Sequence, residues 1–331
     1  MVNNRKRMFA VSLVVPVLAL VVVALARPRD SWARRFPHIE FGETATMGEA
    51  TFVQHMAFPK MPSEVRVYKV QPLPSKRDAL VKILKALPSS SSSETDKVLR
   101  KIGRKSASSL QNEEPLSASI GDWSVDVYSG GQSYIQHYVA KTPEKFEDIP
   151  PAPAPKEAQK AADELLAKLP LPADLHCVKV CPGRVISRGL GPNDQVVKEM
   201  AVLYDAVIDG IPLYGAVDVS VGAGPTILCL NSRLRNIVPD EKVAILSPQE
   251  AYDRLSAGKC HWNQEPYYGK CNVASVKLVY YLGATATTLP YIMPIYVFGG
   301  ESVASGKKPN TWKAFVEAVR PEFLEAKPYR R

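Results

Sequence analysis

A short proline-rich stretch near the middle of the chain is the feature that most constrains its fold. Residues 149–155 read Ile-Pro-Pro-Ala-Pro-Ala-Pro. Successive prolines fix the backbone in an extended form and remove amide donors, so neither a helix nor a central strand can run through them. We therefore expect a stiff linker at 149–155 between two folded units, which suits a length of 331 residues.

The chain before this linker predicts one α+β unit over residues 59–148. Residues 65–70 and 123–128 alternate apolar and polar side chains, as half-buried strands do. Ser75 is followed by apolar residues at helical spacing until a proline, which predicts a capped helix. Residues 134–139 follow a Gly-Gly turn and can return as the partner strand.

The chain after the linker predicts a second, larger unit over residues 156–305. Residues 156–169 have the spacing of an amphipathic helix, and Ser247 begins another with a capping pattern. Six further segments are expected to be strands: 178–180, 201–206, 216–221, 226–230, 277–282 and 291–298. Residues 306–331 are expected to form a C-terminal tail or helix. The predicted fold class is α+β, with a helix packed on an antiparallel sheet in each unit.

The N-terminus predicts export from the cytoplasm. A basic Arg-Lys-Arg at residues 5–7 precedes an uncharged, apolar run at 8–26. This run of 19 residues is longer than most signal-peptide cores and close to the length that spans a bilayer. The small residues before Arg27 equally suit cleavage near Ala26. Residues 1–26 are therefore either a signal peptide or a single transmembrane anchor, and residues 27–58 are expected to be a tether.

The charge of the chain excludes one class of partner. The formal charge of +9 at pH 7 falls to +6 without residues 1–26, which carry three basic groups and no acidic ones. The remaining charge is spread along the chain and forms no basic patch, so we expect no nucleic-acid partner. A mildly basic exported protein suits anionic lipid headgroups or wall polymers, although a solvated surface without a partner is the commoner explanation.

The five cysteines could form disulfides in an exported protein. Cys260 and Cys271 flank a polar segment, and a bridge between them would contribute roughly 3 kcal/mol in the chain-entropy model. If the stretch from Cys177 to Cys181 is a strand, its four residues span ~13 Å, beyond the ~7 Å limit for a bridge, so these two cysteines do not pair unless the strand bends at Pro182-Gly183. Cys229 has apolar neighbours and is expected in the core. The chain lacks the close Cys or His pairs of zinc fingers, so no metal site is predicted.

The sequence also lacks the short motifs of known catalytic sites. It contains no Gly-x-Ser-x-Gly, no His-Glu-x-x-His and no Walker loop. None of its five histidines has a nucleophile and an orienting carboxylate beside it, although a fold can still assemble a triad from distant segments. We therefore expect no catalytic residues and no cofactor.

Three segments of the second unit resemble PepSY-like modules, which occur in thermolysin-type peptidase propeptides and in YycH/YycI-type membrane-anchored regulators. Residues 204–221, with Gly-Ile-Pro-Leu-Tyr-Gly at their centre, resemble the hairpin of these modules. Residues 247–255 resemble their capped helix, and residues 289–298 resemble their closing strand. The residues that carry the resemblance are Gly210, Pro212, Gly215, Ser247, Pro248, Glu250 and Pro294. The first unit resembles a degenerate copy of the module.

The resemblance implies a helix on an antiparallel sheet, no catalytic residues, and inhibition or regulation outside the membrane. We therefore expect a non-enzymatic extracytoplasmic protein of the bacterial cell envelope with a protein-binding or regulatory role. Its expected partner is another extracytoplasmic or membrane protein. The alternatives are a secreted peptidase inhibitor and a cell-envelope hydrolase. The expected binding surfaces are the edge of the 216–230 hairpin, which could accept an added strand, and the polar loop 261–270.

Overall fold

A computed structural model describes nine ranges of the chain: 35–39, 50–88, 115–138, 150–171, 174–187, 195–264, 269–285, 287–303 and 309–325. Its contacts divide the chain into two units, of which residues 39–320 form the larger. Residues 1–38 and 321–331 form the smaller unit, where Phe36 makes an isolated parallel bridge with Leu324. The predicted signal or anchor at 8–26 lies outside the described residues. No helix in the described ranges is long and apolar enough to cross a membrane.

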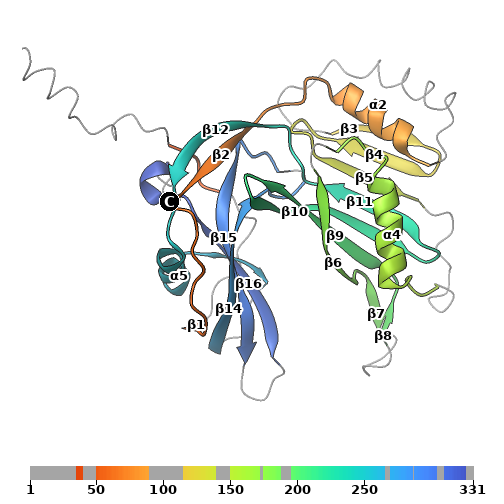
Figure 1. The fold of residues 1–331 in the computed structure, drawn as a ribbon. Coiled ribbons are helices and arrows are strands. Elements are labelled where there is room, and N and C mark those ends of the chain that lie inside the picture. The colour runs from red at the N-terminus through yellow and green to blue at the C-terminus, as the bar shows by residue number, and fades with distance from the viewer. Residues whose placement is uncertain are drawn as a thin grey trace, which may run out of the picture. The chain divides into compact units, whose positions relative to one another are not determined.

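Fourteen strands of the larger unit form one mixed sheet (Figure 1). Its strands are β1 (Ala50–Gln54), β2 (Glu64–Val70), β3 (Leu116–Ile120), β4 (Trp123–Val127), β5 (Ser133–His137), β6 (Leu175–Pro182), β9 (Met200–Ile208), β10 (Ile211–Gly222), β11 (Thr226–Ser232), β12 (Ile237–Ala244), β13 (His261–Gln264), β14 (Gly269–Tyr281), β15 (Tyr291–Val303) and β16 (Asn310–Glu317). A separate two-stranded sheet contains β7 (Val185–Ser187) and β8 (Gln195–Val197). The helices are α2 (Lys76–Ala86), α4 (Pro155–Leu166) and α5 (Pro248–Ser256), with a short 3-10 helix at Pro321–Phe323 in the smaller unit.

The predicted fold class, two units with a helix on a separate antiparallel sheet, is wrong. Of the described residues, 51% lie in strands and 16% in helices. The strands of the two expected units also pair with one another, because β5 pairs with β11, and β2 pairs with β12 and β15. Side-chain alternation specifies which face of a strand is buried, but it does not specify the neighbouring strand. Pairing between the units satisfies backbone groups that two small sheets would leave at their edges.

Strand β10 divides the large sheet into two halves. Strand β9 pairs with both ends of β10, whereas the other neighbour of β10 changes from β11 along residues 217–222 to the end of β14 at Leu213 and Tyr214. The change occurs at a register shift that contains Gly215, whose φ is +63°. We call the strands β6-β9-β10-β11-β5-β4-β3 the α2–α4 half, after the helices on one of its faces. We call β1-β14-β15-β16-β13 the α5 half.

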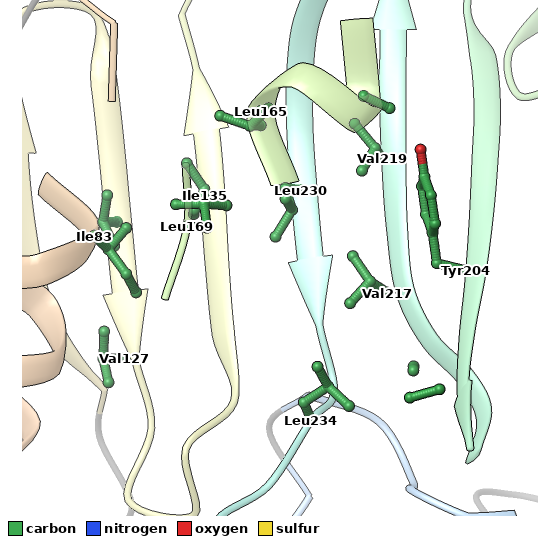
Figure 2. Close-up of a cluster of buried hydrophobic side chains, with 14 of the residues drawn as sticks. Ile83, Val127, Ile135, Leu165, Leu169, Tyr204, Val217, Val219, Leu230 and Leu234 are labelled. Carbon is green, nitrogen blue, oxygen red and sulfur yellow. The ribbon is translucent and has the colours of Figure 1, made fainter. Parts of the chain in front are cut away.

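The core of the α2–α4 half follows the alternation expected of strands. On β9 and β10, every second residue is buried beneath α4, and Tyr204 of β9 donates a 2.7 Å hydrogen bond to Asp163 of α4. Figure 2 shows these aliphatic side chains on the helix-covered face. The buried residues of the two helices are Leu80, Ile83, Leu84, Ala158, Ala162 and Leu165.

The core of the α5 half is aromatic. The ring of Phe52 on β1 stacks on Trp262 of β13 at 5.8 Å between centroids, and it meets the edge of Trp312 on β16 at 5.5 Å. Tyr296 donates a 2.6 Å hydrogen bond to the carbonyl of Leu246, just before α5. Strand β16 occupies residues 310–317, where the sequence analysis predicted a tail or helix.

Candidate functional site

The hairpin residues singled out by the sequence shape the junction between the two halves. Asp209 and Gly210 have φ values of +50° and +76°, as the tight turn between β9 and β10 requires. Pro212 lies in β10, just after this turn. The amide of Gly215 donates a 2.8 Å hydrogen bond to the carboxylate of Asp205. Burial raises the pKa of Asp205, against the effect of that amide and of nearby lysines.

The capping residues form the predicted start of α5. The amide of Glu250 donates to the hydroxyl of Ser247 at 3.2 Å, and the amide of Ser247 donates to the Glu250 carboxylate at 2.6 Å. Pro248 is the first helical residue. Arg320 also contacts Glu250, with a nitrogen–oxygen distance of 3.0 Å. The Ser247 amide first, then the Ser247 hydroxyl and the Arg320 guanidinium, hold the pKa of Glu250 below its usual value.

Pro294 brings the third motif close to the hairpin. It faces Tyr280 of β14, and Leu213 of β10 faces Tyr280 from the other side. Tyr280 is fully buried and donates a 2.7 Å hydrogen bond to the carbonyl of Arg66. The seven motif residues thus hold a turn, a helix cap and a strand, and none of them lines the pocket described below.

All five cysteines are free thiols in the structure. Cys271 of β14 pairs with Ser302 of β15, which in turn pairs with Asn310 of β16. His261, the residue after Cys260, pairs with Phe315 of β16, five residues further along that strand. Five residues along a strand amount to ~17 Å, far beyond the ~7 Å of a disulfide. Burial raises the pKa of each of these two thiols to about 11. The structure gives the bridge no support, and it stays a prediction that counting free thiols without reductant would test.

The two expected binding surfaces, the edge of the 216–230 hairpin and the 261–270 loop, differ in how the structure bears on them. Neither strand of the 216–230 hairpin is an edge, because β11 pairs with β5 and β10 pairs with β9, so that predicted binding edge is wrong. In the 261–270 segment, residues 261–264 form β13 and residues 265–268 lie outside the described ranges. No group of three or more His, Cys, Asp or Glu residues in the described ranges could hold a metal ion.

The structure shows a pocket that the sequence analysis did not predict. It has a volume of about 360 Å³ and lies between α2 and the segment that follows α4. Ligand pockets typically have volumes of about 300–1,000 Å³ and mainly apolar linings with a few polar groups. Most of the lining is apolar and includes Leu73, Ala79, Ile83, Val127, Ile135 and Leu169. We call it the α2–α4 pocket.

The pocket arises because this part of the sheet is wider than the two helices that cover it. Seven strands at ~4.8 Å spacing make a face ~29 Å wide, whereas two helices at ~10 Å each cover ~20 Å. Helix α2 packs over β3 and β4, and α4 packs over β6, β9 and β10. The strip between them is covered only in part by the segment after α4. Figure 2 shows Ile135 and Leu169 between Ile83 of α2 and Leu165 of α4.

Two serines form the polar part of the pocket floor. Ser133 of β5 and Ser232 of β11 face each other across the strand pair, with exposed fractions of 4% and 1%. Both line the pocket, and neither hydroxyl is among the buried polar atoms that lack a partner in the described ranges. The floor therefore presents two facing serines to the pocket.

Arg235 adds a fixed positive charge beside these serines. Its side chain is 4% exposed, and it lines the pocket. Its guanidinium donates to the carbonyl of Leu282 at 2.8 and 3.0 Å, to Thr287 at 2.9 Å and to Ala284 at 3.2 Å. These carbonyls hold the guanidinium in place. At the rim, Lys82 of α2 is exposed.

Sequence reasoning missed the pocket residues because they belong to five separate segments. The one available signal was Ser133, which occupies an inward position of an alternating strand where an apolar residue is expected. A single serine of this kind is common in strands and does not identify a site.

Comparisons with known proteins do not place the chain in a family. No family model matches it, and no curated protein matches it. A solved structure with some likeness is an uncharacterized protein from Eubacterium rectale, 14% identical, with a TM-score of 0.36. The alignment covers 81% of this chain and 87% of that chain. So low a TM-score carries no argument about fold or function, and the PepSY-like resemblance stays a hypothesis.

Proposed function

We propose that the chain is a non-enzymatic extracytoplasmic binding protein with a regulatory role, and that it binds a small ligand in the α2–α4 pocket. The observation that carries the proposal is the pocket floor, where Ser133 and Ser232 face each other in a mainly apolar cavity. An apolar cavity with a few convergent polar groups is the usual form of a small-molecule site.

The construction of the pocket supports a regulatory role. Its walls come from α2, which precedes the proline-rich stretch, and from Leu169 to Leu171, which follow it. A ligand that contacts both walls stabilises the arrangement in which they lie together, by an amount that grows with ligand concentration. A partner that recognises this arrangement would then respond to the ligand. The proposed partner is another extracytoplasmic or membrane protein, in keeping with the predicted export segment.

A pocket-filling substitution tests the proposal. Ala79 is a half-buried residue of α2 that lines the pocket, and Ala79→Phe places a ring in the cavity. Lys85→Phe is the matched control, because it adds the same ring at an exposed position of α2 that does not line the pocket. The full chain would be purified in the form that cells retain, in lipid nanodiscs if the anchor is kept.

The measurement is a thermal-shift screen of small polar and amphipathic molecules, with mass spectrometry of any molecule that co-purifies. We expect at least one molecule to raise the melting temperature of the wild type and of Lys85→Phe, and not that of Ala79→Phe. A ligand that binds all three proteins equally would place binding elsewhere. The absence of any ligand for the wild type would contradict the proposed function.

A further inference from the structure

We infer that the α2–α4 pocket takes a small carboxylate with an apolar tail, with the carboxylate at Ser133 and Ser232 and the tail between α2 and Leu169. This inference rests on the proposed function, because it names the ligand class of the same pocket. The juxtaposition that carries it is a facing pair of serines in the same apolar cavity as the side chain of Arg235, whose guanidinium is held by backbone carbonyls.

The hydroxyls define the geometry of the head group. Directly opposite residues on antiparallel strands have Cβ atoms about 4.5–5.5 Å apart, so one group placed between Ser133 and Ser232 can reach both hydroxyls. A carboxylate accepts a hydrogen bond at each of its two oxygens. Hydrogen bonds to a charged acceptor are roughly twice as strong as those between neutral groups. A carboxylate therefore uses both hydroxyls better than an alcohol does.

The charges around the pocket decide the sign of the head group. Asp78 and Lys82 lie four residues apart on α2 at the rim, both exposed, and their opposite charges largely cancel. Arg235 also lines the pocket, with its guanidinium held by backbone carbonyls. The first turn of α2 also faces the pocket through Ser75 and Ala79, and the N-terminal end of a helix favours an anion. A cationic head group would meet repulsion from both.

The apolar lining and the volume of the pocket determine the kind of tail that the ligand can have. Ile83, Ile135 and Leu169 provide an aliphatic wall without polar side-chain atoms. A cavity of about 360 Å³ lies in the usual range for a small-molecule site and accommodates a short or medium apolar chain such as that of octanoate. Burial of each methylene should tighten binding about fourfold.

Titration calorimetry of the intact protein with octanoate, octanol and octylamine tests the head group. We expect octanoate to bind at least about tenfold more tightly than octanol and octylamine not to bind measurably. The double variant S133A/S232A should weaken octanoate binding by about ten- to a hundredfold and leave octanol binding within about threefold. S124A is the matched control, because Ser124 lies between buried Trp123 and Val125 and therefore points to the opposite face of β4.

The same variants show whether the serines have a merely structural role. If the hydroxyls serve the ligand and not the fold, S133A/S232A without ligand should melt at the wild-type temperature or above it. A lower melting temperature would show that the hydroxyls support the fold, and the inference would then fail.

The outcomes separate this inference from the proposed function. If octanoate and octanol bind equally, or if S133A/S232A leaves octanoate binding unchanged, the carboxylate assignment is wrong while a pocket ligand remains possible. If none of these compounds binds but the thermal-shift screen finds a ligand that Ala79→Phe excludes, the ligand class alone is wrong. If the screen also finds nothing, both proposals fail.

Discussion

The two halves of the sheet bury their cores in different ways. In the α5 half, rings such as Phe52, Trp262 and Trp312 interlock across β1, β13 and β16, with α5 beside them. In the α2–α4 half, the side chains are mainly aliphatic and two separate helices cover a wider face. Ser133 and Ser232 line the pocket in the strip between those helices. Large rings fill the space that one helix leaves, whereas short side chains under two helices leave a pocket.

This contrast predicts unequal costs for removing similar side chains, which is the largest effect we expect. Leu255 of α5 is fully buried in the aromatic half, and Ile83 of α2 lines the pocket. Leu255→Ala should lower the free energy of unfolding by about 4 kcal/mol and Ile83→Ala by about 2 kcal/mol, because Ile83 already lacks neighbours on one side. Urea denaturation measures both. Equal losses would show that the two cores are packed alike.

A second prediction concerns the buried guanidinium. Arg235→Met removes the donors of three carbonyls and should cost about 3 kcal/mol, because hydrogen bonds to charged groups contribute about 1.5–3 kcal/mol each and some carbonyls can find water. Arg233→Met is the control. Arg233 forms a 2.7 Å ion pair with Asp218 and donates a 2.7 Å hydrogen bond to the Gly215 carbonyl, but its side chain is about a quarter exposed, so its loss should cost about 1.5 kcal/mol. Similar losses in the two variants would contradict a structural role specific to Arg235.

The smallest predicted effect is a difference in the pH dependence of stability. Glu250, whose folded pKa is lowered, contributes stability that is present above its usual pKa and is lost as the pH falls through the folded value. Asp205, whose folded pKa is raised by burial, has the opposite sign. Its charge costs stability above the folded pKa, and the cost disappears as the pH falls below its usual value.

Denaturation of Glu250→Gln and Asp205→Asn across acidic to neutral pH measures this difference. Glu250→Gln should be less stable than the wild type at neutral pH and equal to it in acid. Asp205→Asn retains an oxygen acceptor for the Gly215 amide. The variant should therefore be more stable than the wild type at neutral pH, and this difference in the free energy of unfolding should disappear in acid. Parallel curves for the two variants would contradict these assignments.

Local structure was largely predictable from the sequence, whereas the arrangement of strands was not. Ser75 and Ser247 cap α2 and α5 as expected, because a cap depends on residues within one helical turn. The tight turn at Gly210 also follows from its own residues. The pairing of Ile135 with Leu230 joins segments about a hundred residues apart, and both strands present only an alternating pattern. Such a pattern fits many partners equally well.

The pocket was beyond sequence reasoning for the same reason. Ser133 and Ser232 become a pair only when β5 lies beside β11, and Arg235 joins them only because the chain turns just after β11. The motif residues that the sequence singled out form local turns and caps, which support the fold and do not line the pocket. The pocket, in contrast, lies where distant segments meet.

A crystal structure of the intact protein with octanoate tests the central claim most directly. We predict a carboxylate within hydrogen-bond distance of the hydroxyls of Ser133 and Ser232, with its tail against Ile83 and Leu169. Octanoate bound elsewhere, or a pocket that stays free of ligand at saturating octanoate, would contradict the account.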